Sequence, residues 1–449
     1  MRVRRYIVMK QEECLKWVAR DEKVISPCSH LSYFPLVVDS ASGDIITDAD
    51  GNQFIDFLTS ASSLNLGSRH PVVIKAIEKQ LEKCTQYTAA YTYNIPMIEY
   101  AERLTSVYPG GIEAKVCFGN CGSDGNDAAV KFARAYTGRS KIITFENSYH
   151  GNTYGSASLS ACTTRMRNKM GPFLPGIYHF PFYGVSDTLK ENYVEEIETA
   201  FSTHLPPEEV AAVIIEPIQG DGGIHKARPE FIHQLYALCQ KHGILFISEE
   251  VQQGFFRAGH WFSIEEFGVV PDGIIMGKSL GAGLTLGAFM GRKEIIDCLP
   301  APAHLFTLGG NQIACAAGVA AFDYMKSQEF QDILHRNEAL IEELSFALLH
   351  NPHHRCVNFV RGAGMSYAIA ITHPDSDTPD LDGTFKIIYR CYEYGLLLIT
   401  LAGNILRIQP PLTISEENLR KSYAIIDQAI TDYENGMIPD DVLAYRNGW

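Results

Sequence analysis

The chain has 449 residues, 46% of them apolar and 20% charged, a composition ordinary for a globular protein of two domains. The formal charge of −14 argues against a nucleic-acid partner, and no apolar run is long enough to cross a membrane. Eleven cysteines without a paired framework favour a reduced, cytoplasmic protein. Cys117 and Cys121 lie close in sequence, but no second Cys or His pair accompanies them, so no metal site is expected.

The first part of the chain has a basic start followed by a hairpin pattern. Met1 to Arg5 precede an apolar run of a few residues, too short for the core of a signal peptide, and Met9 is an alternative start. Residues 44–57 contain two alternating runs around an Asp-Gly-Asn turn, which predicts a β-hairpin. Pro71 opens a predicted helix, and the polar, aromatic loop after it carries Tyr91.

From about residue 115 the sequence alternates between apolar runs and helical patterns. A glycine-rich turn is predicted at 119–127, before a helix at 128–136, and a second helix runs from Pro229 to Gly243. Strands are predicted at 115–118, 141–145, 211–215, 244–247 and 274–276. This alternation predicts an α/β fold with a mostly parallel sheet covered by helices, and a ligand beyond the carboxyl ends of the strands. After about residue 319, long amphipathic helices and short strands predict a smaller α+β unit.

A lysine at the end of a predicted buried strand is the strongest candidate for chemistry. Lys278 follows the run 274–276 and stands between Gly277 and Ser279. Burial at such a position lowers the pKa of a lysine and makes its amine nucleophilic toward a carbonyl carbon. The alternative is an ordinary lysine whose ammonium reaches solvent past the end of the strand.

Chemically suggestive residues also follow other strands. Gly122 and Ser123 lie where a strand turns into a helix, a place that favours a phosphate but also caps ordinary helices. Tyr149 can stack on a planar ring or pack in the core. Residues 216–223 hold two carboxylates among three glycines. Glu249 ends a buried strand and needs a partner, which a protonated pyridine nitrogen would supply.

Six short segments, taken in chain order, carry a resemblance to a known family. They are Gly122-Ser123-Asp124, Tyr149-His150-Gly151, Glu216-Pro217-Ile218-Gln219-Gly220, Glu249-Glu250-Val251-Gln252, Gly277-Lys278-Ser279, and Thr307 with Gly310-Asn311. In this order and context the chain resembles the class III aminotransferases, pyridoxal 5'-phosphate enzymes of fold type I. The resemblance runs from about Val37 to the 430s. It implies a large cofactor-binding domain at 61–318 and a smaller domain at 319–449, to which the segment 1–60 contributes.

The resemblance also implies roles for single residues. By this resemblance Lys278 forms the Schiff base with the cofactor, and its phosphate is bound by Gly122, Ser123 and Thr307 of the other subunit. The cofactor ring is stacked between Tyr149 and Val251, with Gln252 at its hydroxyl and Glu249 at its pyridine nitrogen. Arg407 binds the substrate carboxylate. Tyr91 is a further candidate for substrate binding. Class III enzymes usually have Asp where this chain has Glu249, which puts the strength of the contact to the pyridine nitrogen in question. They usually have Ala where this chain has Gly125, which implies a looser start of the phosphate-binding helix.

Within the family the chain looks closest to the isoleucine 2-epimerase and amino-acid racemase branch. The residues that carry this are the segments 122–127, 220–223, 301–307 and 399–407. We therefore expect a racemase or epimerase of aliphatic amino acids, with an aminotransferase as the alternative. In both reactions Lys278 removes the Cα proton, which returns either to the opposite face of Cα or to the cofactor. Asp221 is the expected second acid–base group, unless it only pairs with Arg407.

The expected setting is a cytoplasmic homo-oligomer, either a dimer or a dimer of dimers. Its partner is a small amino-acid substrate, with no nucleic acid and no membrane. A non-catalytic, cofactor-binding regulator is a third interpretation. It is disfavoured because no DNA-binding segment precedes the fold, and because Lys278 and Arg407 are both present.

Overall fold

The computed structural model describes residues 9–448, so Met1 to Val8 and Trp449 lie outside the described residues, and with them the basic start. The chain forms two compact units. Unit 1 combines the residues up to His70 with those from Gln328 onward, and unit 2 is the continuous segment Pro71–Ser327. Among the residues described, no helix is long and apolar enough to cross a membrane.

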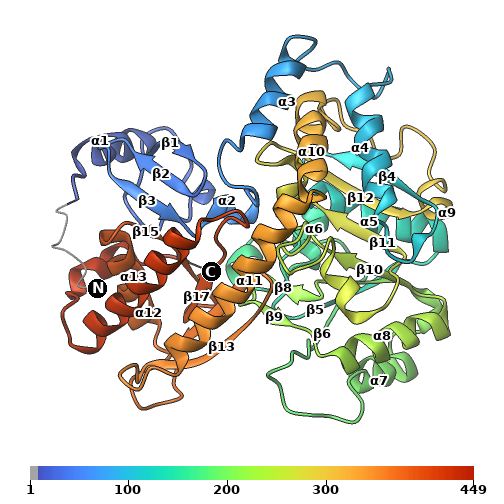
Figure 1. The fold of residues 1–449 in the computed structure, drawn as a ribbon. Coiled ribbons are helices and arrows are strands. Elements are labelled where there is room, and N and C mark those ends of the chain that lie inside the picture. Colours follow the sequence, from blue (N-terminus) through green and yellow to red (C-terminus); the bar gives the residue numbers. More distant parts are fainter. Residues whose placement is uncertain (1–8, 449) are drawn as a thin grey trace. The chain divides into compact units, whose positions relative to one another are not determined.

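Unit 2 is built on a seven-stranded, mostly parallel sheet (Figure 1). In spatial order its strands are β4 (Ala114–Gly119), β12 (Gly287–Arg292), β11 (Gly273–Met276), β10 (Leu245–Glu249), β7 (Val210–Ile215), β5 (Lys141–Phe145) and β6 (Ile177–Phe180). Strand β12 runs antiparallel to both of its neighbours, and the other pairs are parallel. The α/β fold predicted from the sequence is confirmed.

The strands of this sheet consist largely of apolar residues, which helices cover. All six residues of β7 are buried, as a central strand of a parallel sheet requires. Helix α5 (Gly122–Thr137) packs on the sheet, and its Ala129 and Phe132 belong to one core cluster with Ile275 and Phe289. Burial of a phenylalanine side chain of this kind stabilises the fold by roughly 1.5–3 kcal/mol.

Helix α5 begins earlier than its sequence predicts. The expected turn at 119–127 is wrong, because the helix starts at Gly122, directly after the extended residue Cys121. The first residues of α5 are weak helix formers, which concealed this start. The Asp124 carboxylate accepts the Asn120 N–H at 2.7 Å, and this bond, together with packing on the sheet, stabilises the first turn.

The helices predicted to open at Pro71 and Pro229 are confirmed. Helix α8 (Pro229–His242) ends at Gly243, whose positive φ of 61° suits glycine. The other helices of unit 2 are α3 (Pro71–Leu81), α4 (Ile95–Ser106), α6 (Tyr154–Leu159), α7 (Glu195–Thr203), α9 (Lys293–Ile296) and α10 (Gln312–Met325). A short hairpin of β8 (Ile218–Gln219) and β9 (His225–Lys226) follows β7.

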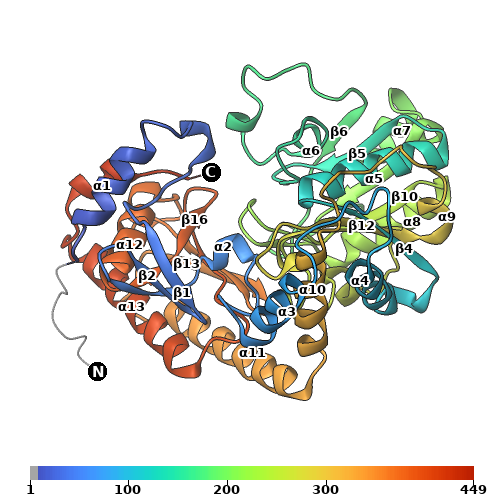
Figure 2. The ribbon, with the colours of Figure 1, turned by 90° about the horizontal axis from the view of Figure 1, so that it is seen from above.

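Unit 1 contains two four-stranded sheets, and its helices are α1 (Glu12–Asp21), α2 (Thr59–Ser62), α11 (Gln328–Leu349), α12 (Leu381–Glu393) and α13 (Glu416–Glu434). One sheet orders β1 (Val38–Ser42), β2 (Ile45–Asp48), β3 (Gln53–Asp56) and β15 (Leu396–Leu397). The other orders β13 (Val357–Ala363), β14 (Ser366–Ile371), β17 (Ile405–Ile408) and β16 (Ile399–Leu401). The predicted hairpin at 44–57 is confirmed as β2 and β3. Figure 2 shows the blue N-terminal strands of this unit together with its orange and red C-terminal elements.

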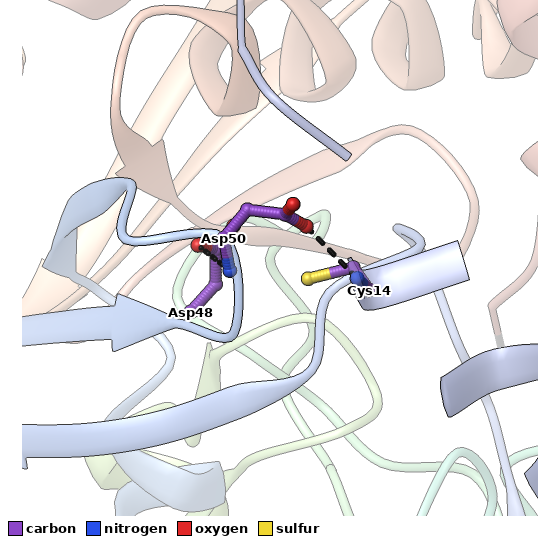
Figure 3. Close-up of side chains that lie close together, drawn as sticks. All are labelled: Cys14, Asp48 and Asp50. Atoms are coloured by element: carbon purple, nitrogen blue, oxygen red, sulfur yellow. Dashed lines mark hydrogen bonds between the residues drawn. The ribbon is translucent and has the colours of Figure 1, made fainter. Parts of the chain in front are cut away.

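A small polar cluster joins α1 to this hairpin. Cys14, Asp48 and Asp50 offer atoms that lie within 4.8 Å of one another. Hydrogen bonds account for both carboxylates. Asp50 accepts the N–H groups of Glu13 at 2.9 Å and Cys14 at 2.8 Å at the start of α1 (Figure 3). Asp48 accepts the N–H groups of Asp50 at 3.0 Å and Asn52 at 2.8 Å in the hairpin turn. These hydrogen bonds, which hold α1 to the hairpin and stabilise its turn, explain why the three residues lie together.

Candidate active site

The parallel strands of unit 2 bring most of the predicted site residues to one edge of the sheet. Strand β4 leads to Gly122, β7 leads to Glu216, β10 ends at Glu249 and β11 leads to Lys278. Because these strands run in the same direction, their carboxyl ends meet at the same edge.

Two glycines allow three segments to approach one another closely at this edge. A Cβ added to Gly277 would come within 2.9 Å of Gly122 Cα and within 3.1 Å of Val251 Cγ1. A Cβ added to Gly122 would lie 2.8 Å from the same Val251 atom. The turn before α5, Val251 and the turn that carries Lys278 therefore form one cradle.

Lys278 occupies a strained backbone conformation. Its φ is +46°, and it is the first residue of a 3-10 turn that ends at Gly281. A left-handed conformation costs a residue other than glycine about 1–2 kcal/mol, so it persists only where the surroundings enforce it. The Leu280 N–H donates to the Gly277 carbonyl at 2.9 Å, and the Tyr100 hydroxyl donates to the Leu280 carbonyl at 2.7 Å. The turn is thus held from two sides.

Glu249 is a buried carboxylate with long hydrogen bonds. It is 4% exposed, and it accepts from Asn126 Nδ2 at 3.4 Å and from the Val251 N–H at 3.3 Å. Burial raises the pKa of Glu249 well above its ordinary value; the Glu216 carboxylate raises it further and the Lys278 charge lowers it. A cationic N–H partner would stabilise this group in its charged form.

The neighbouring Glu250 is directed elsewhere. Its carboxylate accepts from Ser248 Oγ at 2.8 Å, from both the N–H and the hydroxyl of Ser263 at 2.8 Å, and from the Ile264 N–H at 3.0 Å. Glu250 therefore holds Ser263 and Ile264 to the end of β10, and Glu249 is the carboxylate beside α5.

Glu216 is a buried carboxylate that bonds two loops of the site. It is 4% exposed, and its two oxygens accept the N–H groups of Tyr149 and Gly220, each at 2.9 Å. Burial raises the pKa of Glu216 to about 7 against the effect of these two hydrogen bonds; the Asp221 charge adds to the rise and the Lys278 charge opposes it.

Asp221 lies beside Gln252 and is half-buried. Gln252 Nε2 donates to Asp221 Oδ1 at 3.5 Å. A Cβ added to Gly220 would come within 2.3 Å of Gln252 Oε1, so only glycine allows this approach. Burial and then the charge of Asp221 raise the pKa of the Tyr149 phenol.

Ser123, in the first turn of α5, lies against the segment that contains Tyr149. Its Oγ accepts the Asn152 N–H at 3.2 Å, and a Cβ added to Gly151 would lie 2.1 Å from it. The N–H groups at the start of a helix and this hydroxyl are suitable donors for a phosphate.

The structure does not bring Thr307 and Tyr91 into this cluster. Thr307 is exposed, and 85% of the surface of Tyr91 is exposed. The two lie on neighbouring loops, because Thr88 Oγ1 donates to the Thr307 carbonyl at 3.0 Å.

Arg407 lies in unit 1, on β17, and is 1% exposed. Its guanidinium donates to Gln409 Oε1 at 2.5 Å, to the Leu58 carbonyl at 3.2 Å and to Ser62 Oγ at 2.7 Å. All three acceptors are uncharged. Gln409 Nε2 donates in turn to Ser366 Oγ at 2.6 Å, so a buried network orients the guanidinium.

Part of this network is a left-handed turn. Thr59, Ser60, Ala61 and Ser62 have φ values of 48°, 47°, 56° and 64°. The Asp56 carboxylate accepts the Thr59 N–H at 2.7 Å, and Thr59 Oγ1 donates to the Gln409 carbonyl at 3.0 Å. Strain of this kind gathers at functional sites, where the surroundings enforce it.

The family model described as aminotransferase class-III matches residues 28–430. The chain belongs to the class III aminotransferase family. It is 39% identical to isoleucine 2-epimerase of Lentilactobacillus buchneri over 98% of this chain and 100% of that protein. It is 36% identical to leucine/methionine racemase of Thermococcus litoralis, with the same coverage of 98% and 100%. Among solved structures it resembles ornithine aminotransferase from Toxoplasma gondii, which holds pyridoxal 5'-phosphate at partial occupancy, with a TM-score of 0.82, 28% identity and coverage of 96% and 97%.

Pyridoxal 5'-phosphate is therefore the cofactor, and the residues of unit 2 fit it. At Gly122 and Gly277 the backbone segments pack so closely that a Cβ has no room, which brings the start of α5 next to the Lys278 turn. The start of α5 offers N–H donors to a phosphate, and Lys278 offers an amine to a carbonyl. The weakly bonded Glu249 suits a protonated ring nitrogen.

Sequence reasoning missed several residues that hold the site. Asn126 donates to Glu249, and Glu216 joins two loops. The sequence places Glu216 in a motif of carboxylates and glycines but does not indicate that it joins loops. A carboxylate placed directly after an all-apolar strand is the signal that points to Glu216. The turn at Thr59–Ser62 carries no such signal, because its partner Gln409 is 350 residues from Thr59.

Proposed function

We propose that this protein is a pyridoxal-phosphate-dependent racemase or epimerase of amino acids with aliphatic side chains. The observation that carries the proposal is the placement of two acid–base groups. The Lys278 turn lies against Val251. The Asp221 loop is joined to the Tyr149 segment by Glu216, which accepts the N–H groups of Gly220 and Tyr149. In the proposal the side chains of Val251 and Tyr149 contact opposite faces of the cofactor ring. Lys278 and Asp221 therefore approach the substrate from opposite sides.

Inversion at Cα requires such a pair. Bound cofactor withdraws electrons from Cα and so acidifies its proton. Lys278 takes that proton on one face, and Asp221 gives a proton to the other face. Arg407, oriented by Gln409 and Ser62, binds the substrate carboxylate.

The similarity to an epimerase and a racemase over nearly the whole chain supports this proposal. An aminotransferase is the second candidate, and the likeness to ornithine aminotransferase favours it. The two differ in whether the proton returns to Cα or to the cofactor.

The deciding experiment uses the cofactor-loaded enzyme and single L-amino acids, isoleucine, leucine, methionine and alanine, without any keto acid. Chiral chromatography should show the epimer or the D-enantiomer while the total amount of amino acid stays constant. Formation of keto acid with an equal loss of amino acid, and no inverted product, would identify an aminotransferase instead.

We also propose that the protein is a homodimer in which Thr307 of each subunit reaches the phosphate site of the other. Thr307 lies outside the cluster of its own unit, on an exposed loop. Large apolar side chains are exposed on this loop and the neighbouring one: Tyr87 is 63% exposed, Tyr93 97% and Leu308 59%. A second subunit would remove this surface from water.

A further inference from the structure

We propose that Glu216 is a positioning residue that ties the loop carrying Tyr149 to the loop carrying Asp221, and so sets the place of the second proton carrier. The role of Asp221 in this statement rests on the proposed function. The tie between the two loops does not, because it follows from the hydrogen bonds alone.

The two oxygens of Glu216 serve two different loops. One accepts the Tyr149 N–H at 2.9 Å, in the segment that follows β5. The other accepts the Gly220 N–H at 2.9 Å, one residue before Asp221. The carboxylate is 4% exposed, so water does not compete for either bond.

The two loops also contact each other at two further points. Gln219 Nε2 donates to the Glu146 carbonyl at 2.6 Å, and a Cβ added to Gly222 would lie 2.5 Å from the Asn147 carbonyl oxygen. Glu216 adds the bonds to Tyr149 itself and to Gly220, the residue before Asp221. Movement of either loop therefore changes the distance between the ring and the carboxylate.

Both bonds need a carboxylate. Each oxygen of Glu216 faces an N–H donor, and an amide side chain has only one acceptor. Glu216→Gln keeps the size of the side chain but sets an NH₂ group against one backbone N–H. One loop then loses its anchor while the backbone of β7 is unchanged.

The chain offers a matched control in Glu250. It is also a fully buried glutamate at the end of a strand, and it accepts the N–H groups of Ser263 and Ile264. Glu250→Gln therefore disturbs the same kind of bonding, but in a segment that contains neither Tyr149 nor Asp221.

The test is amide hydrogen exchange, followed by mass spectrometry, on the cofactor-loaded enzyme. Glu216→Gln should speed exchange about ten-fold or more in at least one of the two peptides that cover 146–152 and 217–223. Glu250→Gln should act on peptides that cover 263–264 and leave both loops unchanged. An unchanged rate in both loops of Glu216→Gln, or the same loops loosened by Glu250→Gln, overturns the proposal. If Glu216→Gln does not fold, Glu216→Asp keeps both acceptors one methylene further back and should loosen both loops to a smaller degree.

A second measurement joins the tie to the position of Asp221. In deuterated water, Glu216→Gln should lower racemisation at least ten-fold relative to exchange of the Cα proton, and Glu250→Gln should leave that ratio as in the wild type. Loosened loops with an unchanged ratio would overturn the claim that Glu216 positions Asp221. If the wild-type enzyme does not racemise any amino acid, the proposed function fails, and the hydrogen-exchange result still decides whether the tie exists.

Discussion

The positive φ of Lys278 ends strand β11 abruptly and starts the turn at the edge of the sheet. A lysine without a task would be replaced there by glycine or asparagine at lower energetic cost, since both tolerate this conformation. The strained conformation of a lysine at this place supports the role proposed for Lys278.

Lys278→Ala should abolish the visible absorbance band of the bound cofactor and lower activity by on the order of 10³-fold or more, because it removes both the tether and the base. Spectroscopy and single-turnover assays measure the two effects, with Lys293→Ala, an exposed lysine, as the control. Borohydride reduction followed by peptide mapping should find the cofactor attached to Lys278 in the wild type. Attachment in the variant would refute the assignment.

Glu249 is the carboxylate proposed to pair with the ring nitrogen of the cofactor. Glu249→Gln should slow removal of the Cα proton by about 10²-fold, because a neutral amide does not hold a protonated ring nitrogen. Glu249→Asp keeps the charge and should retain most activity. The primary deuterium isotope effect on Cα–H removal measures both. Equal losses in the two variants would mean that Glu249 is structural.

Asp221 separates inversion from exchange. In deuterated water, Asp221→Asn should lose racemisation, while one enantiomer still exchanges its Cα proton through Lys278 with retained configuration. Chiral chromatography with mass detection follows both processes. If racemisation persists and only the Michaelis constant rises, Asp221 is a partner of Arg407, and Tyr91 and Tyr93 are the next candidates for the second proton carrier.

At the scale of elements, α2 and β17 together orient Arg407, the arginine proposed to bind the substrate carboxylate. Gln409→Leu removes the acceptor of both the Arg407 Nε–H and the Ser62 hydroxyl. The Michaelis constant for amino acids should rise about ten-fold or more, with a smaller change in kcat, since an oriented guanidinium binds substrate and transition state alike. Steady-state kinetics checks this.

Ser366→Ala is the graded control, because it loses only the more distant bond to Gln409 Nε2. Its effect should be smaller than that of Gln409→Leu. An equal fall in kcat and a constant Michaelis constant in both variants would show that the network supports the fold and not the arginine.

Elements with local signals were predictable from the sequence. The hairpin at 44–57 has its turn residues and alternation within one short stretch, and α8 has Pro229 at its start and Gly243 at its end. The start of α5 was missed because its first residues have low helix propensity, and tertiary packing reverses the preference. Local signals fail wherever distant residues supply the stabilising contact.

The candidate site shows the same division. Lys278, Glu249 and Glu216 follow buried strands, so their place at the sheet edge could be inferred from the order of elements. The hydrogen bonds that orient them could not, because Glu216 bonds Tyr149 across 67 residues, and Asn126 reaches Glu249 across 123.

At the scale of the whole molecule, the dimer can be tested by mixing two inactive or weakened proteins. In a hybrid of Lys278→Ala and Thr307→Ala subunits, one site receives Lys278 from one chain and Thr307 from the other. If Thr307 acts across the dimer, hybrids should regain activity at one of their two sites. Thr92→Ala, a change at another exposed threonine, is the control for nonspecific effects of mixing.

Light scattering of the active wild-type enzyme gives the complementary measurement. An active monomer, or hybrids without any recovery, would contradict the assignment of Thr307.

Unit 1 is completed by the last third of the chain. Strand β3 finds its parallel partner only in β15, where Ile55 pairs with Leu396. During synthesis on the ribosome the N-terminal strands therefore emerge long before this partner exists, whereas the continuous segment Pro71–Ser327 can fold first. The nascent hairpin has an unpaired edge throughout that interval, and this edge can pair with other chains. A premature stop codon before β15 would thus leave the beginning of the protein, as well as its end, without a fold.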